Sequence, residues 1–167
     1  MYIVLGIIVV IALWFVLSYN SFIRKRNKVE EAFATMDVYL KQRYDLIPNL
    51  VETVKGYAKH ETDTLEKVVA ARSKAMNAKS TDEAVKEDNN LTQTLKSLFA
   101  LAENYPDLKA NESFLNLQGQ LQKIETDIAQ SRKYYNAIVR NYNTGVELFP
   151  QSIVAQLFKF ERKSMFE

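Results

Sequence analysis

His60 is the first residue to consider as a catalyst or metal ligand, because it is the only histidine in the chain and imidazole titrates near neutral pH. Zinc sites of the His-Glu-x-x-His type and di-iron sites built from Glu-x-x-His pairs each need two histidines. The segment His60-Glu61-Thr62-Asp63-Thr64 satisfies neither pattern. We therefore interpret His60 as a structural or surface residue and expect no metal site.

Carboxylates are the other groups that could perform acid–base chemistry, because the chain has 20 Asp and Glu residues. Asp45, Asn49 and Glu52 would lie on one face of a helix, although acidic residues are also favoured at a helix N-terminus for structural reasons. The chain has no cysteine, no glycine-rich phosphate loop and no nucleophile-elbow motif. We therefore expect neither catalysis nor a cofactor.

Charge is nearly balanced overall but is unevenly distributed along the chain. Lys and Arg number 22 against 20 Asp and Glu, which argues against nucleic-acid binding because that requires a basic surface. The first 23 residues are uncharged and would span about 34 Å as a helix, enough to cross a bilayer core of about 30 Å. They lack the basic start and small-residue cleavage site of a signal peptide. We predict an uncleaved transmembrane anchor at residues 1–23 and one helical domain at residues 24–167.

Four basic residues follow this stretch immediately: Arg24, Lys25, Arg26 and Lys28. Basic flanks resist translocation, so we expect an outside N-terminus and a cytoplasmic domain. The same residues would also be attracted to anionic headgroups. Both interpretations place the flank at the cytoplasmic membrane surface, with the lipid bilayer as a partner.

Beyond the anchor, apolar residues recur at helical spacing, and the first helix is expected to end near Tyr44. Asp45 is a suitable N-cap, and Pro48 is tolerated in the first turn of a helix because that amide has no intrahelical partner. We therefore predict a helix boundary here. The apolar positions assigned to the first helix are Val29, Phe33, Met36, Leu40 and Tyr44.

The next two helices are delimited by further local signals. We predict the second helix from Leu46 to about Asn77. Ser80 and Glu83 form a Ser-x-x-Glu capping box, which predicts the start of a third helix. This helix is expected to end before Pro106, and its apolar positions are Leu91, Leu95, Leu98 and Ala102.

A fourth helix has the clearest pattern, since its apolar positions alternate steps of three and four residues up to the region of Pro150. No strand-like alternation competes with it, so we predict an all-α chain with an antiparallel four-helix up-and-down bundle after the anchor. The inward positions of the fourth helix are Phe114, Leu117, Leu121, Ile124, Ile128, Ser131, Tyr135, Ile138, Tyr142 and Gly145.

The predicted helix lengths create a geometric difficulty at the membrane. A first helix from Arg24 to Tyr44 would rise about 31 Å, whereas a second helix from Leu46 to Asn77 would return about 48 Å. The loop at Lys79 would then enter the bilayer, where charge is costly. We therefore expect a strongly tilted bundle, or a bend in the first helix between residues 19 and 27.

These motifs together resemble the LemA family over nearly the whole chain, and the long central run makes the resemblance specific. Phe33 and Met36 stand where Trp and Ile are more usual, and both changes remain apolar. The matching segments are Tyr19-Asn20, Asp37 to Tyr57, Ala71-Arg72, Tyr105 to Asn111, Phe114-Leu115, Leu117, Arg132, Tyr135-Asn136, Tyr142-Asn143 and Phe149-Pro150.

This resemblance implies a bacterial inner-membrane protein with a cytoplasmic four-helix bundle and brings no catalytic residues. We expect a scaffold that self-associates, as a homo-oligomer, or recruits an unknown membrane or cytoplasmic protein. The two motif-rich segments would meet at the far end of the bundle and form one polar and aromatic surface. Its candidate residues are Asp45, Pro48, Asn49, Glu52, Tyr105, Pro106, Asp107, Lys109 and Asn111.

The alternative function is a sensor or a module that binds a small molecule or peptide, in a pocket where Tyr135, Tyr142 and the second helix meet. The aromatic residues leave two further alternatives open. The Tyr and Asn residues around Tyr135 either fill the core or form an exposed face for a partner. The Phe-rich segment from Phe149 to Phe166 either packs on the bundle or docks elsewhere.

Overall fold

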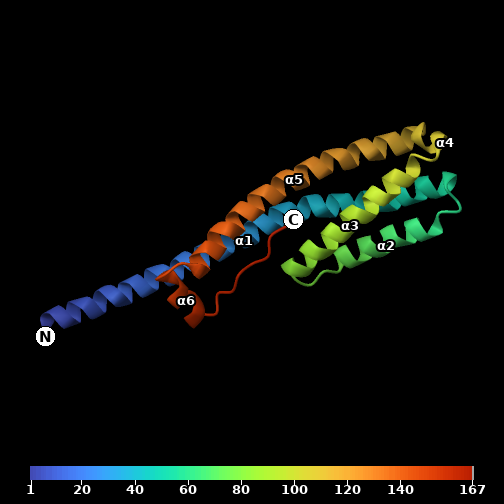
Figure 1. Ribbon diagram of the computed structural model, residues 1–167. Coiled ribbons are helices and arrows are strands. Elements are labelled where there is room, and N and C mark those ends of the chain that lie inside the picture. The colour runs from blue at the N-terminus through green and yellow to red at the C-terminus, as the bar shows by residue number, and fades with distance from the viewer. Residues whose placement is uncertain (167) are drawn as a thin grey trace. The chain divides into compact units, whose positions relative to one another are not determined.

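A computed structural model describes residues 1–166, and these residues form helices joined by short connections, with no strand (Figure 1). The predicted all-α class is therefore confirmed. The chain divides into two compact units, one formed by residues 1–34 with 133–165 and the other by residues 35–132 with Phe166. The helices are α1 Tyr2–Tyr57, α2 Thr62–Met76, α3 Thr81–Ala102, α4 Pro106–Lys109, α5 Glu112–Glu147 and α6 Gln151–Leu157.

Helix α1 continues through Asp45 and Pro48, so the predicted boundary at this point is wrong. Proline has no amide N–H, and Pro48 therefore leaves the Tyr44 carbonyl without its usual donor four residues later. Arg72 on α2 supplies the missing donor, because its Nε lies 2.7 Å from the Tyr44 carbonyl oxygen. The helix ends only at Tyr57, where a short connection leads to α2.

This change of boundary removes the geometric difficulty expected from the sequence. Helix α2 has 15 residues and rises about 22 Å. The stretch of α1 in the same unit, residues 35–57, rises about 34 Å. Helix α2 is therefore shorter than the stretch of α1 in its unit. The expected tilt of the bundle or bend of the first helix depended on a second helix of about 48 Å and is no longer required.

Helices α2 and α3 pack side by side within their unit (Figure 1). The predicted capping box starts α3: Ser80 Oγ accepts from the Glu83 amide at 3.2 Å, and Glu83 Oε2 accepts from the Lys79 amide at 2.8 Å. The predicted apolar face of α3 is buried and faces the core. This face comprises Leu91, Leu95, Leu98 and Ala102, and Val85 extends it toward the start of the helix.

Helix α5 follows its predicted pattern closely. All ten of its predicted inward positions are buried or half-buried. The helix ends at Glu147, shortly before Pro150, as expected. The short helix α4 between α3 and α5 was not predicted, because four residues are too few to produce a recognisable periodicity.

The unit that contains the start of α1 has an aromatic core. The ring of Phe22 stacks on Phe160 at 5.0 Å and meets the edge of Tyr142 at 6.3 Å. The ring of Tyr135 packs edge-on against Phe33 at 6.0 Å. Tyr135 and Tyr142 therefore fill this core, as one of the two alternatives for the aromatic residues expected.

Only part of the Phe-rich segment packs into the core. Phe160 and Phe166 are buried, whereas Phe149 and Phe158 are exposed. The backbone beyond α6 is held by Asn143, whose side chain donates to the Lys163 carbonyl and accepts from the Lys163 amide, both at 2.9 Å.

The start of α1 differs from every other helix in this chain because its apolar side chains are exposed around the helix. Between residues 2 and 17 only Trp14 and Phe15 are even partly covered. The helix is long and apolar enough to cross a membrane. A helix that exposes apolar groups in all directions is suited to a lipid environment.

Candidate interaction surface

The first group of predicted surface residues lies on the exposed side of α1. Asp45, Pro48, Asn49 and Glu52 are all exposed, and their spacing places them along one face of the helix. They belong to a continuous helix and not to a turn, contrary to expectation. The helix hydrogen bonds of α1 therefore hold them on a rigid scaffold.

The second group surrounds α4, in the connection between α3 and α5. Tyr105 donates its hydroxyl to Glu61 at 3.0 Å, and this hydrogen bond raises the pKa of Tyr105. Asn111 donates to the Tyr57 hydroxyl at 2.9 Å, while its side-chain oxygen caps α5 by accepting from the Phe114 amide at 2.9 Å. The connection is thus fixed to the end of α1.

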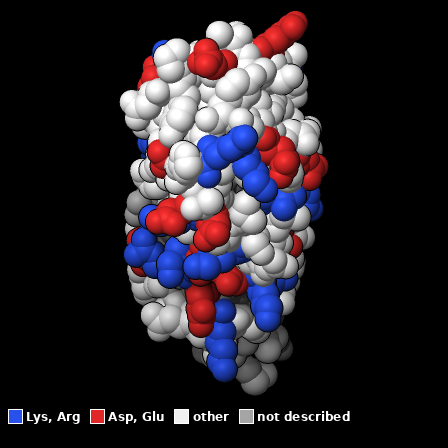
Figure 2. All heavy atoms as spheres, turned by 90° about the vertical axis from the view of Figure 1, so that its right-hand side faces the viewer, with Lys and Arg blue, Asp and Glu red and all other residues white. Residues whose placement is uncertain are grey.

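The other predicted surface residues of this connection are accessible. Pro106, Asp107 and Lys109 are exposed, and Lys109 forms an ion pair with Glu103. Figure 2 shows the face of this unit that carries α4, where Lys and Arg side chains are interspersed with Asp and Glu. A partner that binds this face would therefore be recognised by individual side chains and not by an electrostatic field of a single sign.

The two groups meet only in part. Asn49 and Glu52 line an open cavity of about 600 Å³ together with Glu112 and Ser113, which follow Asn111 directly. Asp45 lies three helical turns before Tyr57, a distance of about 18 Å along α1. The structure therefore brings Asn49 and Glu52 near the α4 connection and leaves Asp45 apart from it, so the single surface expected from the sequence is not formed.

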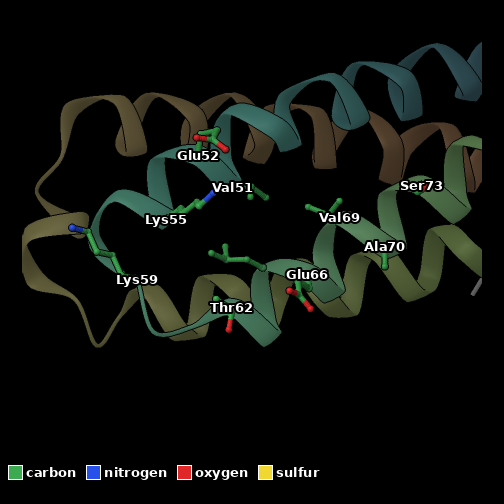
Figure 3. Close-up of a pocket in the computed structure, with 10 residues that line it drawn as sticks. Val51, Glu52, Lys55, Lys59, Thr62, Glu66, Val69, Ala70 and Ser73 are labelled. Carbon is green, nitrogen blue, oxygen red and sulfur yellow. The ribbon is translucent and has the colours of Figure 1, made fainter.

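A groove between α1 and α2 was not foreseen in the sequence (Figure 3). Its volume is about 670 Å³, and Val69 on its wall is 49% exposed. The apolar wall is flanked by both signs of charge, with Lys55 from α1 and Glu66 from α2. The lining residues are Val51, Glu52, Lys55, Lys59, Thr62, Leu65, Glu66, Val69, Ala70 and Ser73.

A buried ionic network was also missed. Arg43 on α1 and Asp88 on α3 both have side chains that are 0% exposed and form an ion pair. Arg43 also donates to Glu125 on α5 at 2.8 Å and to Thr92 at 3.2 Å. The network thus links three helices within one unit.

Arg132 on α5 completes this network. It pairs with the second carboxylate oxygen of Asp88, and its guanidinium lies over the Phe166 ring at 5.3 Å. Burial lowers the pKa of Arg132, and Glu125 acts in the opposite direction. One carboxylate that accepts from guanidinium groups on two different helices is suited to holding those helices together. Because the Asp88 side chain is fully buried, it is not accessible to a substrate.

The family pattern of LemA matches residues 32–167, which include both motif segments and the ionic network. The chain belongs to the LemA family. Protein LemA of Metamycoplasma hominis is 24% identical over 149 residues, covering 89% of this chain and 68% of the relative.

Two further relatives carry a more specific description. Magnetosome protein MamQ of Magnetospirillum gryphiswaldense is 21% identical over 176 residues, and Magnetosome protein MamQ 2 of Paramagnetospirillum magneticum is 22% identical over 177. Each alignment covers 90% of this chain and 65% of the relative. This LemA-family chain thus spans about two thirds of the length of these relatives. Together with the apolar start of α1, these matches indicate a membrane-associated helical protein.

The other residues singled out from the sequence of this LemA-family chain are His60 and the basic flank. His60 is exposed in the connection after α1, and no group of three His, Asp or Glu residues in the described part of the chain could hold a metal ion. The basic flank lies in the unit of residues 1–34 and 133–165. Arg26 approaches Glu30 at 3.8 Å, and Arg24 and Lys28 are exposed.

Proposed function

We propose that this chain is a membrane-anchored scaffold that self-associates or recruits a protein partner at the cytoplasmic membrane face. The observation that carries the proposal is the continuity of α1, which exposes apolar side chains over residues 2–17 and displays polar motif residues from Asp45 onward. One helix therefore joins a lipid-facing segment to a rigid interaction surface. On this proposal the chain acts by binding and catalyses no reaction.

We infer the orientation of the chain in the membrane from the basic flank. Arg24, Lys25, Arg26 and Lys28 would remain cytoplasmic, with the N-terminus outside the inner membrane of a bacterial cell. We further propose that residues 24–167 form an antiparallel four-helix up-and-down bundle. The interhelical bonds of Arg43 to Asp88 on α3 and to Glu125 on α5 support this arrangement.

The interaction surface is tested by cross-linking the full chain in intact membranes and identifying the products by mass spectrometry. The double variant Asp45→Ala with Asp107→Ala should lower the yield of specific products, because exposed carboxylates are removed from both motif segments. A matched control is Asp63→Ala with Asp82→Ala, which removes two other exposed carboxylates from the same unit. Unchanged products in the first double variant would mean that these two motif segments are merely structural.

A second candidate function is a module that binds a peptide or an apolar small molecule. The groove between α1 and α2 favours it, because a volume of about 670 Å³ falls within the range of about 300–1,000 Å³ found for ligand sites. A ligand of this groove would raise the melting temperature of the full chain in detergent. Val69→Glu should abolish that increase, and Val38→Glu, an exposed valine elsewhere on α1, should preserve it.

A further inference from the structure

Two connected hollows lie beside the basic flank, within one unit. The smaller has a volume of about 280 Å³ and is bounded by α1 and α5. The larger, of about 410 Å³, shares Lys25 and Asn141 with it and adds Arg140, Thr144 and Leu148. The smaller is lined by Ser21, Arg24, Lys25, Lys28, Ile138 and Asn141.

The cations of these hollows have no ion-pair partner in the part of the chain that the structure describes. Among the described residues, no ion pair involves Arg24, Lys25, Lys28 or Arg140. The sequence of this unit contains nine Lys and Arg against four Glu, a net charge of +5. Cations that converge without a carboxylate partner form a site for an anion.

Lys25 reaches across to α5. Its Nζ lies 3.0 Å from the position that a Cβ on Gly145 would occupy, so the ammonium group rests against a residue with no side chain. Two helices therefore contribute to the site, with Asn141 as a neutral hydrogen-bonding group. A simple stop-transfer flank would need only the residues of α1.

The larger hollow borders an apolar surface. Leu148 lines it, and the next residue, Phe149, is 80% exposed. In the same unit the ring of Phe158 contacts Tyr19 at 4.7 Å, near the end of the uncharged stretch of α1. A basic hollow beside apolar surface, next to the segment that enters the bilayer, suits an amphiphile with an anionic head better than a free anion.

We propose that this site binds the phosphate of an anionic phospholipid from the bilayer that holds α1. Lys25 and Arg140 bind the phosphate through charge-assisted hydrogen bonds, Asn141 donates a neutral one, and an acyl chain follows Leu148. The site is independent of the scaffold proposed above. Its lipid would fix the position of α5 relative to the membrane surface.

The proposal is tested with the full chain purified in a nonionic detergent. Phosphatidylglycerol, phosphatidylcholine and inorganic phosphate are titrated separately, and bound molecules are counted by native mass spectrometry. We expect saturable binding of one phosphatidylglycerol, with weaker binding of the other two probes. Arg140→Gln should weaken phosphatidylglycerol binding by about fivefold or more.

Two further variants distinguish specific binding at this site from a general attraction of the basic protein to anionic lipid. Asn141→Leu changes no charge and should still weaken binding several-fold. Lys133→Gln removes one charge from an exposed position on the same helix, outside both hollows, and should leave binding within about twofold of the parent. Should Arg140→Gln lose its helical circular dichroism, Asn141→Leu decides the matter.

Three results would overturn the proposal. If Lys133→Gln and Arg140→Gln weakened phosphatidylglycerol binding equally, the binding would be due to non-specific electrostatic attraction. Tight saturation by inorganic phosphate at the same site would assign it to a free anion. Unaltered binding in a folded Asn141→Leu variant would place the lipid elsewhere.

Discussion

At the scale of single residues, the most informative contact is the one between Arg72 and the Tyr44 carbonyl. A proline inside a helix normally costs about 3 kcal/mol or more, partly because one carbonyl loses its donor. Here a side chain 28 residues away supplies that donor at 2.7 Å. The contributions of Pro48 and Arg72 to stability are therefore expected to be coupled, although the two residues lie on different helices.

Arg72→Met should lower the free energy of unfolding by about 1–3 kcal/mol, because it leaves the Tyr44 carbonyl unsatisfied in a partly buried position. The cost should be smaller in a Pro48→Ala background, where the new amide at position 48 can bond to the same carbonyl. Urea unfolding of all four members of the cycle, followed by circular dichroism in mild detergent, measures the coupling. Additive effects would show that Arg72 does not compensate for the proline.

Asp88 is the residue whose loss should be most damaging to stability. Asp88→Asn would remove the carboxylate shared by the fully buried Arg43 and the partly buried Arg132, and would leave Glu125 as the remaining ion-pair partner of Arg43. We expect a loss of about 3–5 kcal/mol, measured by the same unfolding assay. Asp82→Asn, at an exposed position on the same helix, should cost less than about 1 kcal/mol, and an equal cost for both variants would contradict the assigned network.

At the scale of helices, the capping box of α3 contributes independently of tertiary contacts. Ser80→Ala removes the acceptor of the Glu83 amide and should destabilise the chain by about 1 kcal/mol. Ser97→Ala, an exposed position inside the same helix, should change stability by less than about 0.5 kcal/mol. Melting curves of the two variants that coincide would mean that the cap is dispensable.

The helices that were predicted correctly are those whose signals are local. Ser80 and Glu83 lie three residues apart, and the inward positions of α5 recur in one uninterrupted helix, so neither needs knowledge of the rest of the chain. The boundary at Pro48 was placed wrongly because its compensation comes from Arg72 on another helix. No local pattern distinguishes Asp88 from a solvated helix residue, since its burial depends on α1 and α5 meeting α3.

The candidate surface was predicted as residues but not as geometry. Asn49, Glu52, Pro106, Asp107 and Lys109 are exposed, because polar motif residues on a helix face or in a connection rarely have room inside a core. The separation of Asp45 from that connection depends on the true length of α1. The α1–α2 groove depends on how two helices pack, which single-residue patterns do not specify.

At the scale of the whole molecule, the absence of cysteine from the sequence makes the membrane orientation directly measurable. Single cysteines introduced as Tyr2→Cys and Lys67→Cys should differ in labelling by a membrane-impermeant maleimide on intact bacterial cells. Tyr2→Cys should react at once, and Lys67→Cys only after permeabilisation, because the basic flank keeps the helices after it in the cytoplasm. The reverse pattern would refute the proposed orientation.

The clasp made by Asn143 has a consequence for how freely the neighbouring sequence can vary. The Asn143 side chain bonds only to backbone groups of Lys163, namely its carbonyl and its N–H. The two bonds therefore do not depend on which side chain stands at position 163. Nineteen of the twenty amino acids would preserve both. Proline alone would remove the N–H and break one of the two bonds, so position 163 should tolerate every other residue without loss of this contact.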